Sequence, residues 1–457
     1  MLEKDELIDI AQKVEHCLEQ KNFAETKMLL SEMNAVDLAE VLYEISDDKL
    51  AIVYRLLPKE LAAETFVEMD AEQQEFLLNK FNDKEIKDIL SELFLDDTVD
   101  IIEEMPAAIV KKILAQADKE TRDSINAILS YPEDSAGTIM TTEYVNLKAH
   151  YTVKEAFERI RKTGPDKETI YICFVTDQSR KLVGLVSVKD LLLASQDDKI
   201  ADIMETSVIR VNTHADKEYV AHEMQRYGFL SMAVVDKEDR LVGIVTVDDA
   251  MDVLREENDE DFSKMSAVTP SDRPYFKTSV WKIFLNRLPW LLLLMVSATF
   301  TSLIISAYED VLLGLSVTLF ACVPMLMDTG GNAGSQSSVT IIRSIALGET
   351  YPRDVLKVVW REFCVSLMLG VVMGVVCFAK LMLIDSLYNP MNVYVALTVS
   401  IALFITIVIA KLIGSSLPLL AKAIKLDPAV VASPFITTIV DALSLIIYSN
   451  IALGLLS

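Results

Sequence analysis

The sequence predicts a multidomain membrane protein with three parts: an all-α helical-repeat domain, an α/β module of two tandem copies, and an all-α transmembrane domain of five helices. Three observations predict this. A 36-residue pattern recurs through residues 25–130, a strand–helix unit occurs twice between residues 137 and 256, and five long apolar segments follow residue 282. We place the domains at 1–132, 133–256 and 283–457, with a connecting (plug) helix over 257–282.

The first part is an internal repeat without gaps. Glu32-Met33 recurs as Glu68-Met69 and again as Glu104-Met105, and apolar residues follow at steps of three and four. This spacing predicts about two short helices per repeat. Because stacked repeats bury a core only against their neighbours, such an array usually serves as a scaffold or a binding surface.

The second part alternates strands with helices. Residues 182–188 (LVGLVSV) and 241–247 (LVGIVTV) have the pattern of strands, and each precedes an Asp-containing helical segment. In these two copies the region resembles a tandem pair of CBS domains. The resemblance implies a regulatory module that dimerises and senses a ligand, with ATP as a candidate. Tyr227 and Phe229 could stack on its base or belong to the core, and the sequence leaves both alternatives open.

The third part is apolar. Acidic residues (Glu309, Asp310) follow its first long apolar segment, and basic residues (Arg343 to Arg361) follow its second. By the positive-inside rule this alternation places the N-terminal domains in the cytoplasm and the C-terminus outside. The five segments, each long enough to span a bilayer at about 20 residues, are 288–308, 311–327, 358–384, 393–420 and 430–456.

Charge is divided unequally between the parts. Residues 275–457 carry nine acidic and eleven basic side chains, about +2, so the residues before them carry −27 of the chain's net charge of −25. So acidic a surface repels nucleic acid and anionic lipid and attracts cations. Nucleic acid is therefore excluded as a partner and divalent cations are favoured. The five cysteines show no CxxC spacing, so we expect neither disulfides nor a zinc site.

Three acidic residues stand out inside or at the edge of the apolar segments: Asp328, Asp427 and Asp441. A carboxylate at membrane depth costs about 2.5–3.5 kcal/mol on insertion scales and so marks a functional site by default. Asp441 lies in a segment without Lys or Arg; a protonated Asp bonded to another helix is the alternative. For Asp427 the alternative is a first-turn carboxylate of the last helix.

Asp328 opens the glycine-rich run DTGGNAGSQ, whose glycines either break a helix or bring backbones close, with GxxxG packing as the structural alternative. Mg²⁺ prefers oxygen ligands, keeps several waters, and is usually held by one or two carboxylates. Residues 275–457 contain no His, which removes the imidazole ligands that zinc, copper or nickel would favour. We therefore expect Asp441 to be the pore ligand of a partly hydrated Mg²⁺, in a passage lined by Gly331, Asn332, Gly334, Ser433 and Thr437.

The order of repeat, CBS pair and five spans, with the runs PMLMDTGGNAGSQSS (324–338) and PFITTIVD (434–441), resembles the MgtE family of bacterial Mg²⁺ channels. The resemblance covers essentially the whole chain. It implies a channel or transporter for Mg²⁺ uptake in the bacterial plasma (inner) membrane, and no enzyme. It also implies a homodimer whose pore lies on the two-fold axis, where Asp441 of both subunits holds the ion.

The resemblance further implies regulatory Mg²⁺ between acidic surfaces of the repeat domain, the CBS pair, the connecting helix and the membrane face. Cytosolic Mg²⁺ would then favour a compact closed state, because like-charged surfaces need cations between them. Gly228 stands where another acidic ligand is expected. The matching positions are Glu64, Asp96, Asp100, Asp216, Glu218, Asp249, Asp252, Glu257, Glu260, Asp261 and Asp427.

Two other classes of function compete with transport. A membrane-anchored CBS nucleotide sensor or adaptor is disfavoured, because an anchor requires neither five spans nor a buried unpaired Asp. An intramembrane hydrolase is disfavoured because His222-Glu223 is not followed by the second His of an HExxH motif. Selectivity among Mg²⁺, Co²⁺, Mn²⁺ and Ni²⁺ stays open, since oxygen sites admit all four.

Overall fold

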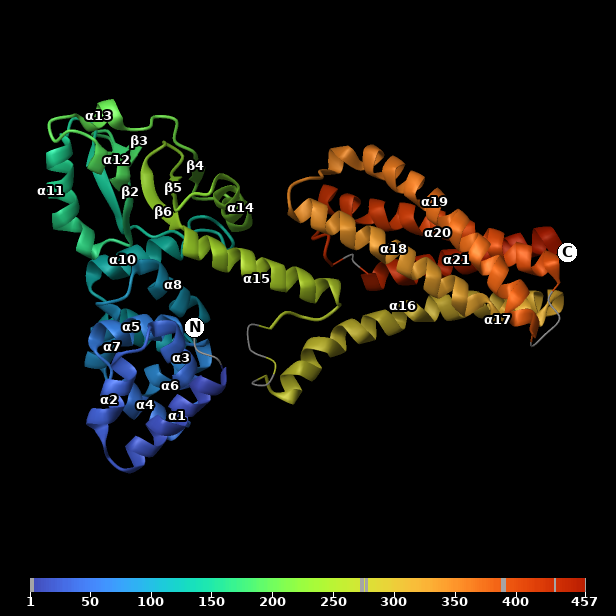
Figure 1. Ribbon diagram of the computed structural model, residues 1–457, viewed down its shortest axis with the longest axis horizontal. Coiled ribbons are helices and arrows are strands. Elements are labelled where there is room, and N and C mark those ends of the chain that lie inside the picture. The colour runs from blue at the N-terminus through green and yellow to red at the C-terminus, as the bar shows by residue number, and fades with distance from the viewer. Residues whose placement is uncertain (1–3, 272–274, 276–277, 388–391, 431–432, 457) are drawn as a thin grey trace. The chain divides into compact units, whose positions relative to one another are not determined.

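The computed structural model describes residues 4–271, 275, 278–387, 392–430 and 433–456, with the backbone alone for 4, 433 and 434. The chain forms two compact units, Met1–Arg255 and Glu256–Ser457 (Figure 1). The first unit holds the helical repeats and the two strand–helix copies. The second holds the long apolar helices.

The repeat region consists of short helices whose first residues recur every 36 positions. Helices α3, α6 and α9 begin at Ala35, Ala71 and Ala107, and the helices after them keep the same spacing. The repeat is thus confirmed, but each full repeat holds three helices, and the expectation of two was wrong. Most of these helices have only eight to ten residues, too few for apolar periodicity to separate neighbours. They are α1 (Lys4–Glu19), α2 (Phe23–Ser31), α3 (Ala35–Tyr43), α4 (Asp47–Tyr54), α5 (Lys59–Val67), α6 (Ala71–Lys80), α7 (Asp83–Leu90), α8 (Leu95–Glu104), α9 (Ala107–Gln116) and α10 (Lys119–Ile128).

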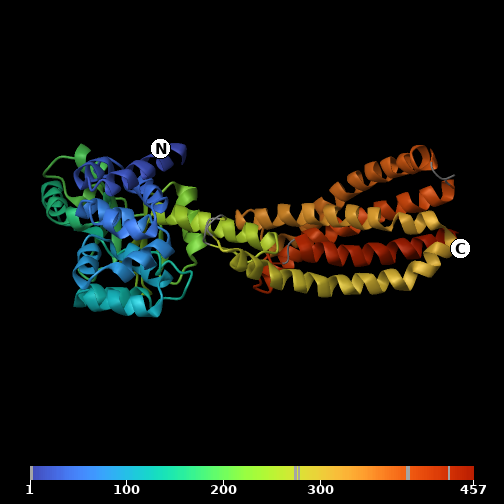
Figure 2. The same cartoon turned by 90° about the horizontal axis from the view of Figure 1, so that it is seen from below.

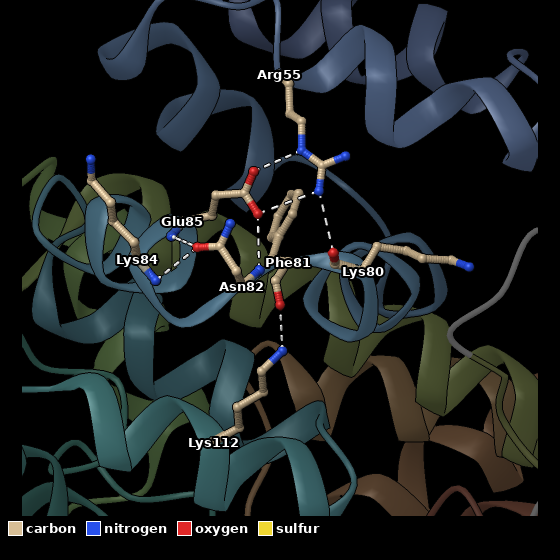
Figure 3. A network of polar contacts seen from close by, with 7 residues as sticks. All are labelled: Arg55, Lys80, Phe81, Asn82, Lys84, Glu85 and Lys112. Atoms are coloured by element: carbon tan, nitrogen blue, oxygen red, sulfur yellow. Dashed lines mark hydrogen bonds and ion pairs between the residues drawn. The ribbon is translucent and has the colours of Figure 1, made fainter.

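Basic side chains tie successive repeats together. The Arg55 guanidinium pairs with Glu85 at 2.7 Å and donates to the Lys80 carbonyl at 3.2 Å, and Lys112 donates to the Phe81 carbonyl at 2.6 Å (Figure 3). Both carbonyls lie at the C-terminal end of α6, where the helix dipole favours positive charge. Beneath them, equivalent apolar residues of the repeats form one continuous core.

The strand–helix copies each contain a three-stranded sheet, ordered β1-β2-β3 and β4-β5-β6. In each sheet the first two strands pair in parallel, and the last two pair antiparallel. Each copy is joined to the other by a reciprocal bridge. Thr141, which precedes β1, pairs with Ile244 of β6, and Glu205, which precedes β4, pairs with Leu185 of β3. The elements are β1 (Tyr144–Lys148), α11 (Val153–Thr163), β2 (Thr169–Thr176), β3 (Leu182–Ser187), α12 (Val188–Leu193), α13 (Ile200–Ile203), β4 (Arg210–Asn212), α14 (Lys217–Tyr227), β5 (Ser231–Val235), β6 (Leu241–Thr246) and α15 (Val247–Met265).

The second unit is a bundle of long helices that run alongside one another in both views (Figures 1 and 2). Helix α18 packs on α20 and α21, α19 packs on α20, and α16 packs on α21. Within the described residues, four segments are long and apolar enough to cross a membrane: α16, residues 352–387, α20 and most of α21. Helix α18 is not among these four, because its Gly, Asn, Ser and Gln residues lower its mean hydropathy. The helices are α16 (Val280–Leu315), α17 (Val317–Ala321), α18 (Val323–Ala346), α19 (Val355–Leu383), α20 (Val393–Ala423) and α21 (Ser433–Leu456).

Three helix boundaries differ from those expected. Helix α16 continues through Glu309 and Asp310 and ends at Leu315, so the second expected segment, 311–327, is shared by α16, α17 and α18. The glycine-rich run does not break its helix, because α18 is continuous and the glycines admit close neighbours instead. The helix expected over 257–282 is found as α15, which begins at Val247 and ends at Met265, just before Ala267 with φ 52°.

Candidate cation sites

A cavity of about 580 Å³ lies among the helices of the second unit. Its polar lining comes from α18 and α21, and every polar group in it offers an oxygen. Helix α18 contributes Asp328 and Asn332, one turn apart, and α21 contributes Thr437 and Asp441, also one turn apart. The lining residues are Ile305, Phe320, Ala321, Val323, Pro324, Met327, Asp328, Gly331, Asn332, Thr437 and Asp441.

Asp328 and Asp441 face this cavity together, and their carboxylates are close enough to repel each other. We expected a single carboxylate position per chain, and the structure supplies two. Asp328 is exposed to the cavity while Asp441 is partly buried. Two like charges in one apolar-walled cavity favour a divalent cation between them, since such an ion offsets both.

Three of the other expected lining residues, Gly331, Asn332 and Thr437, do line the cavity. A Cβ on Gly331 would stand 3.3 Å from the Thr437 methyl carbon and 3.5 Å from an Asp441 carboxylate oxygen, so the glycine lets α18 lie close to the site. Gly334 is not among the residues that line this cavity. It lies one turn beyond Gly331, where a Cβ would stand 3.0 Å from Ile436 of α21 and 3.2 Å from the Ala410 carbonyl of α20. The side chain of Ser433 lies outside the described residues.

A second group of carboxylates lies in the first unit. Single ligand oxygens of Asp96, Glu143 and Glu168 lie within 4.8 Å of one another. Asp96 is in the first turn of α8, whereas Glu143 and Glu168 directly precede β1 and β2 of the first CBS copy. Asp96 is 6% exposed, and the Oε2 atom of Glu168 is fully buried with no hydrogen-bond partner among the described residues. Such an orphaned carboxylate oxygen fits a bound cation.

Electrostatics make this cluster costly without a cation. Burial, then the neighbouring Asp97 carboxylate, raises the pKa of Asp96 to about 7. Burial, then Asp96, raises the pKa of Asp249 to about 7 and that of Glu168 to about 8. Desolvation and Asp249 raise the pKa of Asp100 to about 8. The structure therefore brings together the expected residues Asp96, Asp100 and Asp249.

Three members of the cluster were missed from the sequence: Asp97, Glu143 and Glu168. Asp97 adjoins an expected residue, but Glu143 and Glu168 are single acidic residues before strands, and only the fold brings them to α8. Glu143 also accepts a hydrogen bond from the Leu95 amide at 3.1 Å and so caps α8.

Several other expected ligands have local roles in the first unit. Asp216 caps α14 by accepting from the Tyr219 amide at 3.1 Å, and Glu218 pairs with His222 at 3.6 Å one turn later. Gly228 has φ 67° and ends α14 in the left-handed conformation, where an acidic residue would be strained.

Glu64 and Asp252 are not in the Asp96 cluster. Glu64 is exposed on α5. Asp252 lies on α15 near Glu68, whose pKa is raised by desolvation and then by the Asp252 carboxylate. Asp252 therefore meets a repeat-domain carboxylate, but one turn beyond the expected Glu64.

The expected connector ligands Glu257, Glu260 and Asp261 all lie on α15. Lys264 of the same helix contacts Glu260 at 2.7 Å and Asp427 at 2.7 Å, so a basic side chain bridges two expected cation ligands. Asp427 precedes α21 by several residues and accepts from the Ala429 amide at 2.8 Å. It is not a first-turn residue of that helix.

Comparisons with known proteins agree with this architecture. Residues 323–451 match the family model of a divalent cation transporter, 33–134 match the MgtE intracellular N domain, and 136–197 and 200–256 match the CBS domain. A membrane bundle of this family behind a CBS pair defines a divalent cation transporter that carries CBS domains.

The curated relatives specify the family. The chain is 34% identical to the magnesium transporter MgtE of Thermus thermophilus, over 97% of this chain and 98% of the relative. It is 32% identical to that of Bacillus subtilis over 93% of both. This chain belongs to the MgtE family.

Two solved structures resemble the first unit. The cytosolic domain of the Mg²⁺ channel MgtE in complex with ATP is 36% identical, with a TM-score of 0.51 over 53% of this chain and 99% of that one. The soluble part of a magnesium transporter is 30% identical, with a TM-score of 0.51 over 56% of this chain and 99% of that one.

Proposed function

We propose that this chain takes up Mg²⁺ across the bacterial plasma (inner) membrane through the cavity of the second unit, with Asp441 as the pore ligand. The observation that carries the proposal is the shared exposure of Asp328 and Asp441 to one cavity whose polar groups are all oxygen donors. Mg²⁺ matches such a site, because it accepts one or two carboxylates and fills its remaining positions with water or neutral oxygens.

A homodimer completes the site. If the cavities of two copies meet on a two-fold axis, Asp441 of each copy faces the same ion, as expected for an isologous assembly. The basic connection between α18 and α19 supports a cytoplasmic N-terminal half and an external C-terminus.

Regulation is proposed at the acidic clusters. Carboxylates at the Asp96 cluster repel one another and hold protons at neutral pH, so a cytosolic divalent cation stabilises their close packing. High cytosolic Mg²⁺ then favours the packed, non-conducting state, and its depletion releases the repeat domain from the CBS pair. The CBS pair is the proposed site for ATP, and the exposed Tyr227 ring, stacked on Phe229 at 5.3 Å, offers an aromatic face.

Uptake by the full chain in lipid vesicles tests the pore. We expect wild-type vesicles to accumulate Mg²⁺ down a gradient and Asp441→Asn to reduce the rate by at least roughly a hundredfold, because a divalent ion loses its charged ligand. The matched control is Asp310→Asn, which removes an exposed carboxylate of α16 outside the cavity. Wild-type vesicles without uptake would leave the anchored sensor as the better reading.

The regulatory site is tested separately by patch recording with Mg²⁺ titrated on the cytosolic side. Asp96→Asn with Glu168→Gln removes two charges. The inhibitory Mg²⁺ concentration should then rise roughly tenfold, if the loss of each carboxylate weakens Mg²⁺ binding by about 1 kcal/mol or less. Asp123→Asn, an exposed residue of α10, is the control. Unaltered inhibition in the double variant would exclude the cluster as the sensor.

A further inference from the structure

The second unit contains a buried polar triad that neither the transport site nor the sequence patterns had indicated. Lys411 of α20 donates to Ser337 Oγ of α18 at 2.9 Å and lies 3.4 Å from Glu362 Oε2 of α19. Ser337 Oγ in turn donates to the same Glu362 oxygen at 2.6 Å. Three helices therefore meet at one triangle of polar atoms.

The triangle lies deep among apolar helices. Lys411 is 5% exposed and Ser337 1% exposed, and the Glu362 side chain is 16% exposed. An ammonium and a carboxylate in such surroundings are expensive, and breaking the pair leaves an uncompensated buried charge. Well-packed apolar residues would hold the same helices together as firmly. Stability alone therefore does not account for the triad, whereas fixing one relative position of the helices does.

The triad lies beside a close backbone contact of α18 with α20. Ser337 follows Gly334 by one turn and Lys411 precedes Gly414 by one turn, and at these two glycines the backbones of α18 and α20 come close together. Glycines have no side chain that could bond across this contact, so by themselves they leave the register of the two helices free. The directed bonds at Ser337 remove that freedom.

The position of α18 matters because the same helix carries half of the cation site. Asp328 precedes Ser337 by nine residues, about 14 Å along an unbroken helix at 1.5 Å per residue. A displacement of α18 at Ser337 is thus passed on to Asp328 and Asn332. Both would then shift relative to Asp441 on α21.

We propose that Ser337, Lys411 and Glu362 are positioning residues for cation transport, which fix α18 against α19 and α20 so that Asp328 and Asn332 face Asp441. The inference rests on the proposed transport through this cavity. Ser337 is the member of the triad that belongs to α18. Loss of its hydroxyl therefore frees that helix, while Lys411 and Glu362 still neutralise each other.

The test compares Ser337→Ala with Ser338→Ala in the full chain in vesicles. Ser338 is the neighbouring buried serine, and its hydroxyl has no hydrogen-bond partner among the described residues. We expect Ser337→Ala to raise the half-saturating Mg²⁺ concentration roughly threefold to tenfold, within the usual range for the net contribution of one hydrogen bond, and to change the ratio of Mg²⁺ to Co²⁺ uptake. Ser338→Ala should leave both at the wild-type value.

A second variant separates positioning from stability. Lys411→Met alone should lower the melting temperature, because it strands Glu362 in an apolar environment. Adding Glu362→Gln should restore the melting temperature but not the half-saturating Mg²⁺ concentration. Equal half-saturation and equal ion ratios in Ser337→Ala and Ser338→Ala, or a double variant with wild-type half-saturation, would overturn the inference while leaving the transport proposal standing. A wild-type chain without Mg²⁺ flux would instead remove the transport proposal, and the inference with it.

Discussion

Gly414 of α20 faces the backbone of Gly334 on α18 so closely that a Cβ on Gly414 would stand 2.1 Å from the Gly334 carbonyl oxygen. No side chain can occupy that space without separating the two helices. Small residues at such a contact are the usual means of bringing membrane helices together.

The first prediction follows from this contact. Gly414→Ala should destabilise the membrane unit, on the scale of about 1–3 kcal/mol or more that overpacking costs, because the clash is with backbone atoms and cannot be relieved by a rotamer change. The melting temperature of the full chain in detergent measures it. Gly454→Ala on α21, where a Cβ would meet nothing within 4 Å, is the control and should melt like wild type.

A second prediction concerns Asp328. Asp328→Asn keeps an oxygen in the cavity but removes one of the two charges that face it, so the half-saturating Mg²⁺ concentration for uptake should rise roughly tenfold, the equivalent of about 1.4 kcal/mol. Uptake into vesicles over a range of Mg²⁺ concentrations measures the change. A half-saturation equal to that of Asp310→Asn would mean that Asp441 alone holds the ion.

A third prediction concerns pH and metal removal. The pKa values of Asp96, Asp249 and Glu168 are raised to between about 7 and 8, with Asp97, Glu143 and Asp248 also facing the cluster. The folded state therefore holds more protons than the unfolded state from about pH 4, where free carboxyls titrate, to about pH 8. Its free energy of unfolding must fall as pH rises through that window.

Calorimetry of the full chain in detergent checks the sign. In EDTA the melting temperature of the first unit should be lower at pH 8 than at pH 5. Added Mg²⁺ should raise it more at pH 8, where the carboxylates are charged and the ion replaces the lost protons. An equal Mg²⁺ effect at both pH values would show that the cluster binds no divalent cation.

A fourth prediction concerns Lys264, whose ammonium occupies the space between Glu260 and Asp427. In Lys264→Met this competing cation is gone, so Mg²⁺ should inhibit the channel at a concentration roughly two- to fivefold lower, in line with the modest energy of a partly exposed ion pair. Patch recording with cytosolic Mg²⁺ titrated measures the shift. Lys422→Met, an exposed lysine of α20, is the control; inhibition that matches it would mean that Lys264 does not compete with the ion.

The sequence predicted those features that depend on local pattern. The 36-residue repeat, the two CBS copies and the apolar helices follow from periodicity, and Asp441 stood out because an unpaired carboxylate in an apolar segment is costly. Lys411 and Glu362 were passed over, although the same argument applies to them. Their charges cancel only because α19 and α20 lie side by side, a pairing that no local pattern records.

The missed members of the Asp96 cluster have a similar cause. Glu143 and Glu168 are separated from Asp96 by 47 and 72 positions, and neither belongs to a motif. Their role depends on how the first CBS copy meets α8. Gly331 lines the cavity and Gly334 does not, for a geometric reason: residues three apart on a helix point about 60° from one another and so can contact different neighbours.

The reciprocal bridges of the CBS copies also limit how this protein can be divided. Because Thr141 pairs with Ile244 and Glu205 pairs with Leu185, each copy carries an edge that belongs to the other's sheet. A cut between the copies would leave two half-finished sheets with open edges. The pair is therefore the smallest portable piece, and a CBS module grafted from this chain into another protein has to travel as residues 135–256, which keep Ala250 and Val253 of α15 in its core.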